Sequence, residues 1–474
     1  MEFDKDLMAR QEARSLCAQA KKAQEILAGM SQERLDAICK AVAEGFAKEA
    51  GVLAKQACTE TGFGNETDKT EKNRFASERV YKAIQGMKCV GVLKEAKEGN
   101  LWEIGVPVGV IGAIVPSTNP TSTVCYKALI ALKSGNAIVF SPHPKALNCT
   151  LHAVQVVMQA ARQAGAPEGC VSCLSAGSMA GCQELMASPH ISLLLATGGP
   201  AMVHACYSSG KPAIGVGAGN GPAYIHTSAN VPKAMAAILK SKTFDYGTIC
   251  ASEQSIIVEK SMESKVLEEG RKQGFYLMNE EEAGHLAKLL FKPNGALNPE
   301  VVGKSAGHLA QMAGFCVPNG TKILMAREEQ AGPTRPYSME KLCPVLAFFV
   351  MDNEDAVLSK CVEVLRHEGS GHTFSIHAED KKVVRKFALQ IPVSRFLVNT
   401  PSALGGIGAT TELFPALTLG CGAVGGSSTS NNVSPMDLIN IRRVAWGREE
   451  NTVIPEDETL VQLITNKILE RLGG

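Results

Sequence analysis

Apolar residues recur at three- and four-residue spacing through residues 5–85, which predicts a helical N-terminal segment. From about residue 108, short apolar runs alternate with helical stretches. The runs at 108–115, 137–142 and 191–200 predict buried strands, and the stretches at 119–135, 145–165 and 201–210 predict helices. Apolar strands that alternate with helices indicate a parallel, doubly wound sheet, which binds ligands beyond the carboxyl ends of its strands.

The alternation begins again after residue 218 and predicts a second α/β domain. Strand-like runs follow at 255–260, 344–350, 372–377 and 395–399. The Gly/Ser/Asn-rich segment 418–435 is either a long loop that faces a ligand or a domain boundary.

Two further segments stand apart from this alternation. Residues 87–106 predict a hairpin, because two strand-like pieces flank a charged loop with a Gly-Asn turn. At the C-terminus, the polar linker "GREENTVIPEDE" precedes a short helix with Leu460, Ile464, Ile468 and Leu472 at four-residue spacing. That apolar stripe needs a partner surface, either on the body of the protein or on another molecule.

The composition excludes several classes of function. Among 474 residues, 48 basic side chains nearly balance 47 acidic ones, so we expect no nucleic-acid or membrane partner. The charged N-terminus predicts no secretory signal, and no apolar run is long enough for a transmembrane helix. The 15 cysteines are therefore expected as free thiols in the cytoplasm. Cys170 and Cys173 form a C-x-x-C without a second ligand pair, so no metal is expected.

Four motifs carry candidate chemistry, and they occur in a fixed order: "PSTNP" (116–120), "TGGP" (197–200), "FDYGTICASEQ" (244–254) and "EKLCP" (340–344). Over residues 5–450 the chain resembles the aldehyde dehydrogenase superfamily. More closely, it resembles the CoA-acylating branch, which includes the aldehyde-oxidising half of bifunctional alcohol/aldehyde dehydrogenases and the acetaldehyde and propionaldehyde dehydrogenases of microcompartments.

The resemblance implies an α/β fold with a doubly wound cofactor-binding domain, an α/β catalytic domain and a β oligomerisation arm. The expected boundaries are 1–85 and 107–217 for the domain that binds NAD and CoA, 218–426 for the catalytic domain, 86–106 and 427–450 for the arm, and 451–474 for the linker and C-terminal helix.

By this resemblance Cys250 is the nucleophile. A cysteine thiolate suits the task because it adds to an aldehyde carbonyl and then carries the acyl group as a thioester. Asn119 and the Cys250 N–H are expected to form an oxyanion hole, although an Asn before Pro120 is also a good helix cap. His372 is expected near the substrate or the CoA thiol, with a buried core histidine as the alternative.

The resemblance also assigns residues to the nicotinamide nucleotide. Glu340 is expected to bind the nicotinamide ribose, and the glycines of the "TGGP" turn are expected to let the nucleotide approach the backbone. The choice between NAD and NADP stays open, with NAD favoured, because hydrolytic relatives carry other residues than Ser141 and Pro144 around the adenosine ribose. The full set of cofactor-binding candidates is Ser141, Pro142, His143, Thr197, Gly198, Gly199, Gly217 and Glu340.

Val216 occupies the position at which hydrolytic aldehyde dehydrogenases carry a glutamate that activates water. Valine cannot act as a general base, so the thioester is expected to wait for the thiol of coenzyme A. The expected reaction converts a small aldehyde, CoA and NAD⁺ into acyl-CoA and NADH, reversibly, with acetaldehyde or propionaldehyde as substrate. The small residues of "LGCGAVGGSS" (419–428) are expected to line the pocket.

Three alternatives remain at this point: an acylating enzyme for a charged aldehyde such as sulfoacetaldehyde, a hydrolytic aldehyde dehydrogenase, and a silent scaffold protein. The arm predicts a homodimer or homotetramer. No alcohol dehydrogenase half is expected, because the sequence ends near residue 474. The C-terminal helix resembles the encapsulation peptides that bind shell proteins, which predicts a place inside a bacterial microcompartment as an alternative to the open cytoplasm.

Overall fold

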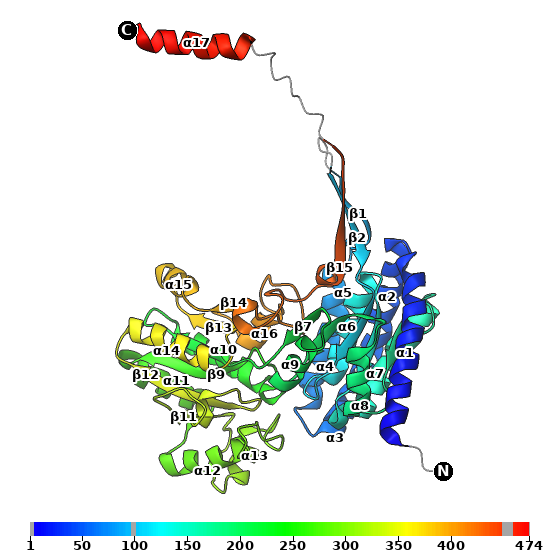
Figure 1. Cartoon of the computed structure of the whole chain (residues 1–474). Coiled ribbons are helices and arrows are strands. Elements are labelled where there is room, and N and C mark those ends of the chain that lie inside the picture. The colour runs from blue at the N-terminus through cyan, green and yellow to red at the C-terminus, as the bar shows by residue number, and fades with distance from the viewer. Residues whose placement is uncertain (1–3, 96–100, 448–457, 474) are drawn as a thin grey trace.

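The computed structural model describes residues 4–95, 101–447 and 458–473. Two parallel sheets with helices packed on them form the body, and a narrow antiparallel sheet projects from it (Figure 1). The predicted α/β class with parallel sheets is therefore confirmed.

The N-terminal segment is helical, as predicted. Its helices pack against α6, α7 and the first sheet, and bury small and aliphatic side chains such as Ala13, Leu35 and Val42. The elements are α1 (Lys5–Ala28), α2 (Gln32–Lys48), α3 (Ala50–Thr61), α4 (Glu66–Arg74), the π-helical turn η1 (Phe75–Arg79) and α5 (Val80–Ile84).

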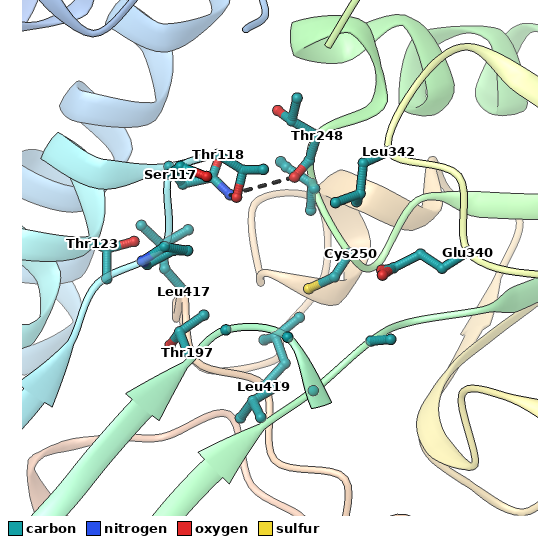
Figure 2. A pocket seen from close by; sticks show the side chains of 18 of the residues that line it. Ser117, Thr118, Thr123, Thr197, Thr248, Cys250, Glu340, Leu342, Leu417 and Leu419 are labelled. Carbon is teal, nitrogen blue, oxygen red and sulfur yellow. Dashed lines mark hydrogen bonds between the residues drawn. The ribbon is translucent and has the colours of Figure 1, made fainter. Parts of the chain in front are cut away.

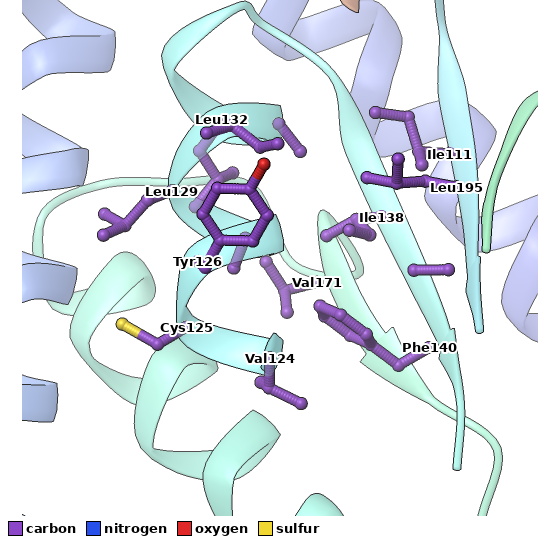
Figure 3. Packing of buried hydrophobic residues seen from close by; sticks show 14 of the residues in the cluster. Ile111, Val124, Cys125, Tyr126, Leu129, Leu132, Ile138, Phe140, Val171 and Leu195 are labelled. Carbon is purple, nitrogen blue, oxygen red and sulfur yellow. The ribbon is translucent and has the colours of Figure 1, made fainter. Parts of the chain in front are cut away.

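The first sheet has five parallel strands in the order β5-β4-β3-β6-β7. The three predicted strands are its three central strands, and every residue of β3 and β4 is buried because helices cover both faces. Figure 3 shows α6 beside this sheet, where Tyr126 and Leu132 belong to the same buried cluster as Ile138 and Phe140. The bounds are β3 (Val110–Ile114), α6 (Pro120–Lys133), β4 (Ala137–Ser141), η2 (Pro144–Ala146), α7 (Leu147–Gln163), β5 (Val171–Cys173), α8 (Met179–Ala187), β6 (Ile191–Thr197), α9 (Pro200–Tyr207) and β7 (Ala213–Val216).

The second sheet has seven parallel strands in the order β10-β11-β12-β9-β8-β13-β14. The strands predicted at 255–260, 344–350, 372–377 and 395–399 are β9, β12, β13 and β14. The bounds are β8 (Gly221–Ile225), α10 (Val231–Thr243), η3 (Phe244–Gly247), β9 (Glu253–Glu259), η4 (Lys260–Met262), α11 (Glu263–Gln273), β10 (Phe275–Leu277), α12 (Glu280–Leu290), α13 (Ala306–Met312), β11 (Ile323–Arg327), η5 (Pro336–Ser338), β12 (Val345–Met351), α14 (Glu354–His367), β13 (Gly371–His377), α15 (Lys381–Ala388), β14 (Val393–Val398) and α16 (Ser402–Gly406).

The projecting sheet contains β1 (Gly91–Glu95), β2 (Leu101–Pro107) and β15 (Ile439–Ala445), with β2 in the centre. β1 and β2 pair antiparallel as a hairpin requires, while the predicted Gly-Asn turn lies outside the described residues. Two tryptophans meet edge to face on this sheet, Trp102 and Trp446, with ring centroids 4.8 Å apart.

The segment before β15 differs from the predicted arm. Residues 427–438 run over the body instead of joining the sheet, and include the short turn η7 (Pro435–Leu438), while η6 (Ala423–Gly425) precedes them. The Tyr126 hydroxyl donates to the Val433 carbonyl oxygen at 2.5 Å, and the Asn136 amide donates to the Leu438 carbonyl oxygen at 2.8 Å.

The last helix, α17 (Glu458–Leu472), forms where the periodicity predicts it. Its apolar stripe lies in solvent: Ile464, Ile468 and Leu472 are 52%, 51% and 78% exposed. The Leu460 side chain lies outside the described residues. Within the part of the chain that the structure describes, no helix combines the length and apolarity needed to cross a membrane.

Candidate active site

Cys250 lies in the turn that joins η3 to β9, the central strand of the larger sheet. Figure 2 shows its sulfur extending into a pocket that also receives the Glu340 carboxyl group. Burial, and then the nearby Glu340, raise the pKa of Cys250 to about 12. The group is therefore a thiol at neutral pH and must lose its proton when a substrate is attacked.

A glycine contact fixes this turn against its neighbours. A Cβ at Gly219 would lie 2.1 Å from the Cys250 carbonyl oxygen, so only glycine fits there. The Gly219 N–H donates to Glu340 Oε1 at 2.8 Å, which holds the carboxyl group beside Cys250. Burial, and then the charge of Glu368, raise the pKa of Glu340 to about 8, so Glu340 is mostly protonated at pH 7.

Asn119 occupies the N-cap position of α6, yet its side chain forms no capping hydrogen bond. The amide nitrogen instead donates to Thr118 Oγ1 at 3.1 Å and to the Thr248 carbonyl oxygen at 3.4 Å. The side chain thus faces the turn that carries Cys250, as an oxyanion donor must.

Sequence reasoning missed a cluster of charged residues behind Asn119. The ammonium groups of Lys69 and Lys72 both contact the buried carboxylate of Asp245, at 2.9 and 2.5 Å. Lys72 also donates to Asn119 Oδ1 at 2.5 Å. In the sequence these lysines look like solvent-exposed residues of a polar helix. The cluster could have been suspected only from the two lysines at positions i and i+3 and from Asp245 inside the cysteine motif.

Two adjoining pockets form a cleft at the carboxyl ends of β3, β4 and β6. Both are lined by His143, Thr197, Gly198 and Gly199. Among the other candidates, Ser141 and Pro142 line only the outer pocket, whereas Gly217 and Glu340 line only the pocket of Cys250.

The cleft fits a nicotinamide nucleotide. A Cβ at Gly199 or Gly217 would meet no atom within 4 Å, so the backbone there faces open space that a ligand can approach. Carboxyl ends of parallel strands are also the usual place for such a ligand.

The structure does not bring His372 into either pocket. It is fully buried, and its Nδ1 shares a hydrogen bond with Thr373 Oγ1 at 2.8 Å. Burial, and then Arg395, hold the pKa of His372 well below its usual range. The ring lies behind Gly219, where an added Cβ would be 3.2 Å from Cε1. Among the described residues its Nε2 has no hydrogen-bond partner.

The glycine-rich loop 419–428 was expected to line the pocket, but only its first residue, Leu419, does so. Residues 420–428 do not line the pocket, because the loop turns back over the body after Leu419. The wall is instead aliphatic and contains Val216, Ile249, Leu342, Ile407, Leu417 and Leu419. Val216 is thus at the pocket surface, where a water-activating group would act.

No thiol or carboxylate cluster suggests a metal. In the described ranges there is no group of three or more His, Cys, Asp or Glu side chains that could hold a metal ion. The cysteines, including Cys170 and Cys173, are free thiols.

The Cys250 thiol lies in the pocket at one end of this cleft, an arrangement that nucleophilic catalysis by a cysteine could use. The model of the "Aldehyde dehydrogenase family" matches residues 5–274, and the chain belongs to this family.

Similar proteins are named as dehydrogenases of aldehydes, and one of them as acetylating. The bifunctional aldehyde-alcohol dehydrogenase AdhE of Escherichia coli is 45% identical over 446 residues, which cover 93% of this chain and 50% of that protein. The chain thus spans about half the length of this relative. The crystal structure of an acetylating aldehyde dehydrogenase from Geobacillus thermoglucosidasius has a TM-score of 0.93 and 48% identity, and covers 95% of this chain and 99% of its own.

Two structures of lower sequence identity are also similar. A propionaldehyde dehydrogenase from a fucose-utilisation microcompartment of Clostridium phytofermentans has a TM-score of 0.83 and 28% identity over 94% of this chain and 98% of its own. The propionaldehyde dehydrogenase of Rhodopseudomonas palustris, with bound CoA and an acylated cysteine, has the same TM-score and identity over 92% and 97%.

Proposed function

We propose that the protein is a CoA-acylating aldehyde dehydrogenase that converts a short aliphatic aldehyde, CoA and NAD⁺ into acyl-CoA, NADH and a proton. The observation that carries this proposal is the pocket wall around Cys250, which presents Val216 in place of a base. Glu340 is the one carboxyl group among the described lining residues, and it is mostly protonated at neutral pH. Among the described lining residues, water therefore finds no ionised carboxylate to act as its general base.

The chemistry follows from the positions of the side chains. The Cys250 sulfur attacks the aldehyde carbon while its thiol proton leaves, and the carbonyl oxygen becomes an alkoxide. The Asn119 amide N–H and the Cys250 backbone N–H would stabilise that charge. Gly198, Gly199 and Glu340 would hold a nicotinamide nucleotide, which when bound would supply the hydride acceptor. A thioester on Cys250 results, and the CoA thiol displaces the acyl group and restores the cysteine.

CoA dependence tests this function. With propionaldehyde and NAD⁺ alone, the purified protein is expected to form about one NADH per active site and then stop, because the acyl group stays on Cys250. Addition of CoA should give sustained turnover, measured as absorbance at the NADH wavelength. Equal turnover with and without CoA would establish a hydrolytic enzyme. Complete absence of NADH with small aldehydes would favour the scaffold alternative.

The lining of the pocket favours an uncharged substrate. The described residues that line it include no lysine or arginine, and much of its wall is aliphatic. Burial of a sulfonate there without a cation would be costly. We therefore favour acetaldehyde or propionaldehyde over sulfoacetaldehyde, and a higher kcat/KM for sulfoacetaldehyde in the same assay would reverse this choice.

The arm and the C-terminal helix are the surfaces through which we expect the protein to bind its protein partners. β1 and β15 are the two edges of the projecting sheet, and exposed edges pair readily with strands of another chain. This supports a homodimer or homotetramer. α17 presents Leu463, Ile464 and Ile468 to solvent, and this apolar face suits a shell protein of a microcompartment.

Deletion of residues 455–474 should separate these roles. Because the helix makes no part of the cleft, the truncated protein is expected to retain kcat and its oligomeric mass by sedimentation. It should lose co-purification with co-expressed microcompartment shell proteins. Continued co-purification, or loss of the oligomer, would contradict the assignment of α17, and a monomeric full-length chain would contradict that of the arm.

A further inference from the structure

A buried lysine lies directly behind the proposed oxyanion donor. Lys72 belongs to α4, and its side chain is 2% exposed. Its ammonium group donates to three acceptors: Asn119 Oδ1 at 2.5 Å, Asp245 Oδ2 at 2.5 Å and Thr248 Oγ1 at 2.8 Å. These acceptors lie on the two loops that carry the proposed donor and the proposed nucleophile, so Lys72 links both halves of the site.

The contact with Asn119 decides which end of its amide faces the pocket. An ammonium group can only donate, so the amide oxygen must face Lys72 and the amide nitrogen must point the other way. The nitrogen accordingly reaches the Thr248 carbonyl oxygen, two residues before Cys250. A flipped amide would present its oxygen to the developing alkoxide and repel it.

We propose that Lys72 is a positioning residue that locks the Asn119 amide in the orientation able to stabilise the alkoxide, and that its charge strengthens the amide as a donor. A positive charge on the amide oxygen withdraws electron density from the N–H group, which makes its hydrogen bond to an anion stronger. The inference rests on the function proposed above, in which Cys250 adds to an aldehyde.

The position of Lys72 is itself fixed by an unusual backbone. Asp245 and Tyr246 have φ values of 48° and 51°, a region that non-glycine residues seldom adopt. This conformation brings the Asp245 carboxylate to the lysines of α4. A Cβ at Gly64 would lie 1.8 Å from Asp245 Oδ1, so a glycine is required to leave room for that carboxylate.

Lys69 provides a matched comparison within the same cluster. It is 4% exposed and also binds Asp245, at 2.9 Å. Its other acceptor is the Thr118 carbonyl oxygen at 2.9 Å, and it makes no hydrogen bond to the Asn119 side chain among those the structure describes. Replacement of either lysine removes one partner of Asp245, but only replacement of Lys72 frees the Asn119 amide.

The test compares Lys72→Met, Lys72→Gln and Lys69→Met. The readout is the rate of the first NADH turnover with propionaldehyde and NAD⁺ in the absence of CoA. Lys72→Met should slow this burst by about 10- to 100-fold, with KM for the aldehyde within about threefold, because a transition-state contact is weakened. Lys72→Gln should fall between it and the wild type, since an amide N–H can hold Asn119 Oδ1 without the charge. Lys69→Met should slow the burst by less than about threefold, although it too loses an ion pair.

A double-mutant cycle with Asn119→Ala tests whether Lys72 acts through Asn119 or stabilises the site independently of it. If Lys72 acts through Asn119, Lys72→Met should slow an Asn119→Ala enzyme by less than about twofold more. Multiplicative effects, or equal effects of Lys69→Met and Lys72→Met, would overturn the proposal. Alkylation of Cys250 by iodoacetamide develops no oxyanion and should stay within about twofold of wild type; a larger change would mean that the cysteine loop itself has moved.

Two further outcomes are distinguishable. If Lys72→Met does not fold, Lys72→Gln replaces it in the cycle with Asn119→Ala. Additive activation free energies of the two substitutions in that cycle would overturn the inference. If the wild type shows the burst but no CoA-dependent turnover, the acylating function fails, while the burst still measures the role of Lys72.

Discussion

Replacement of Cys250 by serine is expected to lower the rate of NADH formation by about 10⁴-fold or more, as loss of a catalytic nucleophile does in other enzymes. A serine hydroxyl ionises far less readily than a thiol, and Glu340, the one carboxyl group among the described lining residues, is mostly protonated at neutral pH. The measurement is the burst and steady-state rate with propionaldehyde, NAD⁺ and CoA. Mass spectrometry of the wild type after reaction without CoA should place the acyl group on the peptide with Cys250.

Cys316 supplies the control for this substitution. It is an exposed thiol that lines a separate surface pocket, so Cys316→Ser should retain wild-type turnover. Because the pKa of Cys250 is raised to about 12, its alkylation by iodoacetamide should accelerate by about tenfold per pH unit between pH 7 and 9, with no plateau. More than about 1% residual activity in Cys250→Ser would remove Cys250 from the role of nucleophile.

Replacement of Asn119 by alanine is the second large effect that we expect. Loss of one oxyanion donor lowers kcat by about 10²- to 10³-fold, which corresponds to about 3–4 kcal/mol of transition-state stabilisation. KM for the aldehyde should change by less than about threefold, because the alkoxide exists only after attack. Steady-state kinetics over a range of aldehyde concentrations separates kcat from KM.

Asn119→Asp sharpens this prediction. A carboxylate at this position would face the alkoxide with a like charge, so its kcat should be no higher than that of Asn119→Ala. Asn119→Ala should keep the wild-type rate of Cys250 alkylation, because the side chain of Asn119 does not cap α6 and is dispensable for the helix. A loss that appears only in KM, or a kcat loss below about fivefold, would assign Asn119 to substrate binding instead.

The central strands of the first sheet could be predicted because their information is local, whereas the interior strand β11 of the second sheet was not predicted. β3, β4 and β6 are mostly apolar and lie between helices, which gives a pattern readable in eight residues. β5 and β10 contain only three residues each, at the edges of their sheets, and the pattern indicates no strand there. Short edge strands carry too few side chains for a periodicity to emerge.

The site could be predicted only where a motif is contiguous. Cys250, Asn119 and Glu340 were found because each lies within a short motif, although three separate segments must fold together to place them in one pocket. The pair of Lys72 and Asp245 is separated by 173 residues, and nothing in either segment alone says that the lysine is buried. Likewise, the loop after Leu419 was expected in the pocket, because a sequence does not reveal where a flexible glycine-rich chain turns away.

The tryptophan pair on the projecting sheet determines what optical spectroscopy can report. The chain contains two tryptophans, and both of them, Trp102 and Trp446, belong to this pair. Neither sheet of the body contains a tryptophan. Fluorescence excited selectively at tryptophan therefore reports on the projecting sheet and on any chain that packs against it. A shift in emission maximum on dilution would follow assembly, whereas melting of the two large sheets has to be followed by circular dichroism or by the tyrosines.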